Sequence, residues 1–158
     1  YSSLMLKIFK IFIVLFFISS GIASSEIIKP SMNIKPVQVI EIQLEGLKKN
    51  DFPNKDQGIE QTWEFAHPSN QRFTGPLNRF KEMIKGNSYN MLLNHISHEI
   101  IEIYSDDKKA VYEVTILDLN KTYFKFRWQV EKFLDKGPLK NCWLTTVVSQ
   151  PIPLGSST

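Results

Sequence analysis

The segment Thr122–Lys132 alternates without a break between bulky apolar and polar side chains. Successive side chains of a β-strand point to opposite faces of a sheet, so this period of two predicts a strand that is packed on one face and wet on the other. The packed face would carry Phe124, Phe126, Trp128 and Val130, and the wet face Lys125, Arg127, Gln129 and Glu131. Such a strand needs another layer to cover its rings.

Three further strands are expected after Asn94. They are residues 95–104, 110–117 and 141–149. A bulge is expected in the first, because Ile100, Ile101 and Ile103 cannot all face one way. The last is apolar on both faces and is therefore predicted to be central in the sheet. Residues 151–158, which contain two prolines, are predicted to be a flexible tail.

The earlier part of the chain shows helical spacing instead. Apolar stripes predict helices over residues 36–50, 56–68 and 74–86, with the inner faces Val37, Ile40, Leu44 and Leu47, then Ile59, Thr62, Trp63 and Ala66, then Leu77, Phe80 and Ile84. Pro36 suits a first helical position. Asp56 and Thr74 are expected to cap the second and third helices, and Pro68 and Gly86 to end them.

Helices followed by a meander of about four strands predict an α+β domain whose N-terminal helices pack on a curved antiparallel sheet. We expect a cone with an apolar mouth, with Phe124, Phe126, Trp128 and Trp143 on its walls. The chain has 158 residues, of which 42% are hydrophobic and 22% charged, as in an ordinary globular protein. Residues 36–150 are therefore predicted to form a single domain, after a polar lead over residues 24–35.

The first 23 residues have the pattern of a secretory signal peptide. Lys7 and Lys10 precede the unbroken apolar run of residues 11–18, and small residues follow it. Gly21 and Ala23 fit the rule for cleavage after Ala23. The apolar stretch is too short to span a bilayer. We therefore expect an exported protein, periplasmic or secreted, that meets a membrane only through this targeting segment.

Charge and cysteine content limit the classes of partner and cofactor. Without the signal peptide the chain has 17 basic and 16 acidic residues, a formal charge of +1. No clustered basic excess is present, so nucleic acid is not expected as a partner. Cys142 is the only cysteine, which excludes an intrachain disulfide and a cysteine-based zinc site. Its apolar neighbours Trp143 and Leu144 predict that it is buried.

Three stretches of the chain carry a resemblance to a known family. They are residues 39–47, the block Trp63-Glu64-Phe65-Ala66-His67-Pro68-Ser69-Asn70-Gln71-Arg72-Phe73-Thr74-Gly75-Pro76-Leu77-Asn78-Arg79-Phe80, and Cys142-Trp143-Leu144-Thr145. The chain resembles, roughly over residues 36–148, the family catalogued as domain of unknown function 4864. That family is similar in its helix-then-sheet order to the nuclear-transport-factor-like (cystatin-like) cone fold, which ketosteroid isomerases also use. The resemblance implies a fold and no particular activity.

Histidines are the first side chains to weigh for chemistry. His95 and His98 would point to opposite faces of a strand, so we expect a solvated strand start and no metal site there. His67 precedes Pro68 at a predicted helix end, where it could cap the last carbonyl groups or serve as a ligand-binding residue. No Ser-His-Asp set, no Gly-x-Ser-x-Gly motif and no glycine-rich phosphate loop is present in the sequence.

The residues around Pro68 and the large rings supply the remaining candidates. Residues 68–76 are expected to form an ordered loop, in which Arg72 and Arg79 either bind Glu60 or Glu64 or take an anionic ligand. The candidate ligand-binding residues are Trp63, His67, Arg72, Phe126, Trp128 and Trp143. No catalytic residue, metal or cofactor is predicted.

Three functional hypotheses remain open. The favoured one is a non-catalytic module that binds a small apolar ligand or a protein partner, because no polar constellation points into the predicted core. An alternative is a small-molecule isomerase or dehydratase with an apolar cone-shaped pocket, which would use His67, His95 or a buried acid as its acid or base. The third is a structural domain that assembles through the outer sheet face, for example as a homodimer.

Overall fold

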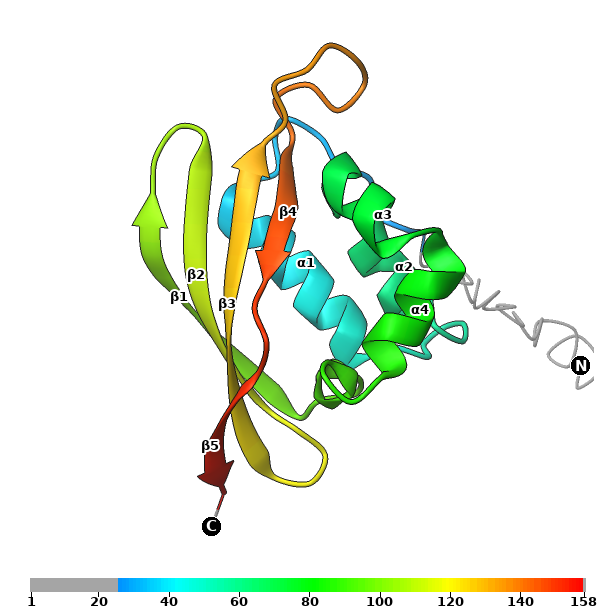
Figure 1. Cartoon of the computed structure of the whole chain (residues 1–158), viewed down its shortest axis with the longest axis vertical. Helices are drawn as coiled ribbons and strands as arrows, with labels where there is room; N and C mark the ends of the chain where they lie inside the picture. The colour runs from blue at the N-terminus through cyan, green and yellow to red at the C-terminus, as the bar shows by residue number, and fades with distance from the viewer. Residues whose placement is uncertain (1–25, 158) are drawn as a thin grey trace, which may run out of the picture.

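A computed structural model of the chain describes residues 26–157. Within that range a layer of helices covers one face of an antiparallel sheet (Figure 1). The predicted α+β architecture, with N-terminal helices packed on the sheet, is confirmed. The sheet is open and does not close into a barrel. The predicted signal peptide, residues 1–23, lies outside the described residues.

The elements follow one another in the predicted order, helices first. The helices are α1 (Pro36–Lys48), α2 (Gln57–Glu64), α3 (Pro68–Thr74) and α4 (Leu77–Lys85), followed by the 3₁₀ helix η2 (Asn90–Leu92). The strands are β1 (Ser97–Ser105), β2 (Lys109–Leu117), β3 (Thr122–Lys132), β4 (Trp143–Val148) and β5 (Ile152–Ser156).

The alternation along β3 produces the core as expected. Phe126 and Trp128 are each only 1% exposed, and Val130 is fully buried. They pack against the apolar stripe of α1, which includes Leu44 and Leu47. Arg127, between the two rings, is exposed on the opposite face. The buried side of β3 therefore faces the helical layer.

The prediction of a central last strand is wrong. The order of the sheet is β1-β2-β3-β4, so β4 lies at an edge. Its outer edge is nevertheless covered, because the connection between α2 and α3 runs along it. The amide of Thr145 donates to the Phe65 carbonyl and the amide of His67 donates to the Thr145 carbonyl, both at 2.8 Å. A chain segment thus takes the place of a neighbouring strand.

A bulge interrupts the pairing of β3 with β4. Val130 lies opposite Thr145 and Gln129 lies opposite Val147, so Thr146 is an extra residue in β4. The expected irregularity in the first strand is also present, between Glu102 and Tyr104 of β1. Bulges of this kind bend a strand and leave the extra residue without a partner in the ladder.

The C-terminal residues pair with the sheet, contrary to the expected flexible tail over residues 151–158. Strand β3 is long, and β4 pairs only with its second half, from Trp128 onward. β5 fills the open edge of the first half, with Thr122 opposite Ser156 and Lys125 opposite Ile152. The proline within β5 is compatible with an edge strand.

The helix boundaries around Pro68 also differ from expectation. Pro68 does not end the second helix, which stops at Glu64, but occupies the first turn of α3. Proline is favourable there because its missing N–H has no partner in a helix. Pro76, not Thr74, precedes α4. The hydroxyl group of Thr74 donates instead to the Asn70 carbonyl within α3 at 2.9 Å.

Asp56 precedes α2 as predicted but does not cap it. Its side chain makes no hydrogen bond to the helix N-terminus. Instead, the carboxylate lies 2.7 Å from the Lys85 ammonium group on α4 and accepts a hydrogen bond from the Asn50 amide. The hydrogen bond from Lys85 lowers the pKa of Asp56. Asp56 therefore ties α2 to α4 and does not stabilise the helix end.

Helices α1 and α2 cross at two glycines. A Cβ atom on Gly58 would lie 2.9 Å from the Cα atom of Asn50 and closer still to the Gly46 carbonyl group. A Cβ atom on Gly46 would instead make ordinary contacts at 3.4 Å. Gly58 is thus the residue that allows the close crossing.

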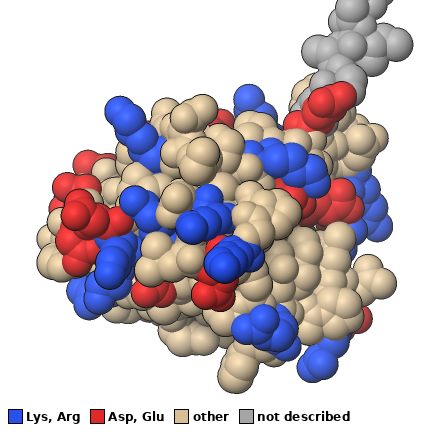
Figure 2. All heavy atoms as spheres, turned by 90° about the horizontal axis from the view of Figure 1, so that it is seen from above, with Lys and Arg blue, Asp and Glu red and all other residues tan. Residues whose placement is uncertain are grey.

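The surface carries both signs of charge. On the face seen in Figure 2, Lys and Arg side chains are interspersed with Asp and Glu. No helix within residues 26–157 is long and apolar enough to cross a membrane.

Candidate functional site

A cavity of about 330 Å³ lies between the helices and the C-terminal half of the sheet. Helices α3 and α4 and strand β4 form much of its wall. The remaining walls come from α1, from the end of α2, from Trp128 on β3 and from the segment around η2. The apolar side chains that line it include Leu47, Phe80, Ile84, Leu92 and Val148. The cavity is thus part of the space between the two layers that the core does not fill.

The amide of Gln43 is the polar group in the deepest part of this wall. Gln43 is 1% exposed, on the inner face of α1. Its Oε1 atom accepts from Trp128 Nε1 at 3.0 Å and from Thr145 Oγ1 at 2.7 Å. Its Nε2 atom donates to the Thr62 carbonyl at 3.1 Å. Because the indole N–H can only donate, the orientation of the amide is determined. Gln43 thereby joins α1, α2, β3 and β4.

Asn70 connects α3 to the bulge of β4. Its Nδ2 group donates to the carbonyl groups of Thr145, at 3.2 Å, and Thr146, at 2.7 Å. The bulge makes both carbonyl groups available on one side. Gln71 adds a bond from its amide to the Trp63 carbonyl at 3.0 Å. These bonds hold a helix that has no buried residue of its own.

Large apolar side chains surround the mouth of the cavity. Phe73 on α3 is 93% exposed although it lines the cavity. Met83 on α4 and Val147 on β4 also line it and are partly exposed. Exposed rings beside an apolar cavity are typical of ligand-binding openings.

The described wall of this cavity carries no charged side chain. Among the described residues that form its wall there is no Asp, Glu, His, Lys or Arg. Tyr89 is the titratable side chain there, and it donates to the Val148 carbonyl at 3.1 Å. Burial raises the pKa of Tyr89, so its phenol stays protonated near neutral pH. The cavity is a neutral site.

The structure does not gather the predicted ligand-binding residues in one place. Trp128 lines the cavity. Phe126 is buried beside Tyr89, with ring centroids 6.4 Å apart, and Trp63 packs against Phe80 at 5.1 Å. Trp143 lies beneath the Lys132 ammonium group, 5.4 Å from its ring centroid.

Arg72 and His67 lie elsewhere. Arg72 is exposed on α3, and in the described part of the chain neither it nor Arg79 forms an ion pair. Glu60 binds Lys81 and Glu64 binds Lys29, so both glutamates that were expected to bind these arginines have lysine partners.

His67 caps the start of a helix, contrary to the expected role at a helix end. Its Nδ1 atom accepts from the backbone amide of Ser69 at 3.0 Å, which is an N-cap interaction for α3. Burial lowers the pKa of His67, in keeping with a neutral, accepting ring. The ring packs against Phe133, with centroids 5.4 Å apart.

The expected solvated strand start at His95 and His98 is also wrong. His95 is 2% exposed, and its Nε2 atom lies 2.7 Å from Nδ1 of His98. The two rings meet because β1 begins only at Ser97, so His95 does not follow strand geometry. His95 Nδ1 lies 2.7 Å from the Leu92 carbonyl and must donate to it. His98 Nε2 lies 3.7 Å from a carboxylate oxygen of Glu45.

This histidine pair has no third metal-ligating side chain placed with it in the described part of the chain. Within residues 26–157 no three His, Cys, Asp or Glu side chains are placed to hold a metal ion. Burial lowers the pKa of His95 to about 4 and also lowers that of His98. Both rings are therefore neutral above mildly acidic pH and stabilise the junction between η2 and β1.

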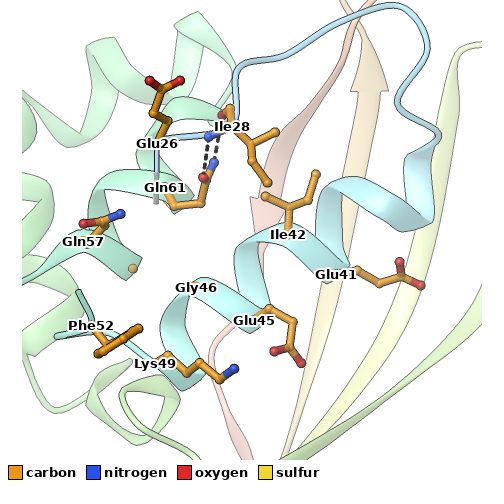
Figure 3. Close-up of a pocket in the computed structure, with 11 residues that line it drawn as sticks. Glu26, Ile28, Glu41, Ile42, Glu45, Gly46, Lys49, Phe52, Gln57 and Gln61 are labelled. Carbon is orange, nitrogen blue, oxygen red and sulfur yellow. Dashed lines mark hydrogen bonds between the residues drawn. The ribbon is translucent and has the colours of Figure 1, made fainter. Parts of the chain in front are cut away.

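A second hollow is an open groove over the crossing of α1 and α2 (Figure 3). Figure 3 shows the polar lead beside it, where Gln61 binds both backbone groups of Ile28, at 2.8 Å and 2.9 Å. Phe52, which is 74% exposed, lies at one end and Glu41 at the other. The groove is more exposed than the cavity and holds charges of both signs, so the cavity is the stronger candidate site.

The fold and the cavity define an α+β domain with an open antiparallel sheet and a neutral, apolar internal site. Its order of elements is compatible with the nuclear-transport-factor-like cone. The family model described as Domain of unknown function (DUF4864) matches residues 31–145, so the chain belongs to that family. No curated protein matches the chain, and no solved structure matches it.

Three site residues were missed from the sequence. Gln43 had a usable signal, because it follows Ile40 by three positions and precedes Leu47 by four, which places it on the buried stripe of the helix. Asn70 bonds the backbone of a distant strand, which no local pattern in the sequence indicates. Tyr89 lies between two elements, and nothing in its neighbourhood in the sequence indicates the contact with Val148.

Proposed function

We propose that this domain is a non-catalytic module that binds a small, mainly apolar molecule in the cavity between α3, α4 and β4. The observation that carries the proposal is a cavity of about 330 Å³ whose walls are apolar and whose polar side chains are neutral. Ligand sites of small molecules have volumes of about 300–1,000 Å³ and combine apolar walls with a few fixed polar groups. The Gln43 amide, held by Trp128 and Thr145, is such a group.

The isomerase or dehydratase alternative has less support. Such an enzyme needs an acid or base whose pKa is shifted by burial and whose atoms reach the substrate. The buried His95 has a shifted pKa, but neither it nor His98 is among the residues lining the cavity. A binding role needs no such group.

Alanine variants of two exposed phenylalanines, one at the cavity and one at the groove, test where a ligand binds. The uncharged fluorescent probe 1-naphthylamine, which is small enough for the cavity, is expected to bind there when it is titrated into the protein and followed by fluorescence. Phe73→Ala should weaken binding about tenfold, because a ring at the mouth gains contact with the ligand. Phe52→Ala removes another exposed ring, 74% exposed against 93% for Phe73, from the α1–α2 groove and should leave binding unchanged. The reverse result would place the ligand in the groove and refute the proposal. Native mass spectrometry of the protein purified from its own host should show a bound small molecule.

A protein-interaction role has one observation in its favour. Ile101 on β1 is 49% exposed, on the outer face of the sheet opposite the helices. On the same face Lys125 lies 3.7 Å from Glu113, so the surface is mixed. If the domain forms a homodimer through this face, Ile101→Lys should convert it to a monomer in light scattering, and an unchanged mass would exclude this face.

Export is part of the same proposal. Lys7 and Lys10, followed by the apolar run of residues 11–18, support a cleaved signal peptide. The N-terminal sequence of protein recovered from its host should begin at Ser24. Protein that retains Lys7 would contradict cleavage.

A further inference from the structure

We propose that the ligand of this cavity is an uncharged molecule of about thirteen heavy atoms that donates a hydrogen bond through a hydroxyl or N–H group. The inference rests on the proposed binding function and adds the chemical class of the ligand. Three properties of the cavity support it: its volume, the direction of its hydrogen bonds and the absence of charge from its wall.

The volume limits the size of the ligand. A cavity of about 150 Å³ inside a protein core holds one benzene molecule, which has six heavy atoms. In proportion, the cavity of about 330 Å³ holds about thirteen heavy atoms. That corresponds to two fused rings with a substituent, or to a branched chain of similar bulk.

Three hydroxyl groups in the wall already donate their protons to acceptors within the protein. Thr145 donates to Gln43 Oε1 at 2.7 Å, and Tyr89 donates to the Val148 carbonyl at 3.1 Å. Thr62 donates to the Gly58 carbonyl at 2.9 Å. Each of these acceptors is an amide or backbone oxygen, which carries no proton, so the direction of each bond is determined. What the hydroxyl groups can still offer a ligand is their lone pairs.

The side-chain amide groups of the wall also offer a ligand more acceptors than donors. Both Nδ2 protons of Asn70 are used by the carbonyl groups of Thr145 and Thr146. Among the described residues nothing donates to Asn70 Oδ1, which therefore remains an acceptor. Gln43 Oε1 already accepts two bonds, and one proton of its Nε2 group is used by Thr62. Acceptors thus outnumber free donors in the side chains of the wall, which favours a ligand that donates.

The charge of the wall excludes ionised ligands. No Lys, Arg or His lines the described cavity, so a carboxylate or phosphate would lose its hydration without a partner. No Asp or Glu lines it either, so an ammonium ion would have only neutral acceptors. Burial of an unpaired charge costs several kcal/mol, which is more than these hydrogen bonds return.

Four naphthalene derivatives of matched shape test the proposal by isothermal titration calorimetry at pH 7. They are 2-naphthol, which donates; 2-methoxynaphthalene, which only accepts; 2-naphthoate, an anion; and 2-naphthylmethylammonium, a cation. We expect 2-naphthol to bind about three- to tenfold more tightly than the methyl ether, as one hydrogen bond predicts. Both ions should bind at least about a hundredfold more weakly than 2-naphthol.

Failure of this inference is distinguishable from failure of the proposed function. If the methyl ether binds as tightly as 2-naphthol, or either ion binds more tightly, the ligand class is wrong while a binding function stands. If none of the four binds and 1-naphthylamine does not bind either, the proposed function itself is wrong. Phe73→Ala should weaken the binding of 2-naphthol and Phe52→Ala should not, which confirms that the measured binding occurs in the cavity.

Discussion

Replacement of Gln43 by leucine tests whether the buried amide holds the helical layer to the sheet. Leucine has a similar size but no polar atom, so the variant removes the acceptor of Trp128 Nε1 and Thr145 Oγ1. A buried donor left without a partner costs about 1–3 kcal/mol. The threonine hydroxyl can rotate to another acceptor, whereas the indole N–H cannot. We therefore expect the free energy of unfolding to fall by about 2–4 kcal/mol.

Urea denaturation followed by circular dichroism would measure this loss. The control is Gln150→Leu, in an exposed connection, which should change stability by less than about 0.5 kcal/mol. In a double-mutant cycle with Thr145→Val, the double variant should lose less stability than the sum of the losses of the two single variants, because both substitutions remove the same hydrogen bond. A loss below about 0.5 kcal/mol for Gln43→Leu, or strictly additive changes, would refute the assigned role of the amide.

Three other outcomes are expected. Gly58→Ala should destabilise the protein by about 3 kcal/mol or more, because its Cβ atom would clash with the backbone at the helix crossing. Gly46→Ala, the control, should be neutral or stabilising by up to about 1 kcal/mol. Equal melting temperatures of the two variants would contradict the crossing geometry. Burial lowers the pKa of His95 to about 4, so the unfolded chain, with a value near 6.5, binds more protons, and stability should fall by up to about 3 kcal/mol as the pH drops from about 6.5 to about 4. His95→Asn should flatten that slope in urea titrations, and an unchanged slope would assign it to other groups. Cys142 is 1% exposed and burial raises its pKa, so a thiol reagent should react only in denaturant, and fast labelling of the native protein would show that the segment before β4 opens.

The sequence predicted those parts of the fold that depend on local periodicity. The alternation along β3 and the apolar stripe of α1 each determine a buried face, and the two faces pack together. The positions of β4 and β5 could not be predicted in this way, because they depend on how much of β3 each strand covers. How many residues of one strand pair with another depends on the whole sheet, and no local sequence pattern indicates it.

The site was less predictable than the fold for a related reason. Trp128 was identified because a large ring on a buried face stands out in a sequence. Asn70 and Tyr89 contribute through bonds to backbone carbonyl groups of β4, which are the same for every residue type. His95 was misjudged because the start of β1 lies two residues later than the apolar pattern indicated. Asn70 and Tyr89 were therefore missed because their side chains meet distant backbone, and His95 was misjudged because of a strand boundary.

Because Thr146 is an extra residue in β4, the later side chains of the strand lie on the faces opposite to those that strict alternation along the chain would give them. Loss of Thr146 would leave Val147 opposite Gln129 and Val148 opposite Trp128, because the pairing on either side of the bulge is already in register. It would remove the bulge at which Asn70 binds two consecutive carbonyl groups, so this deletion should loosen α3 from the sheet and leave the faces of the two valines unchanged.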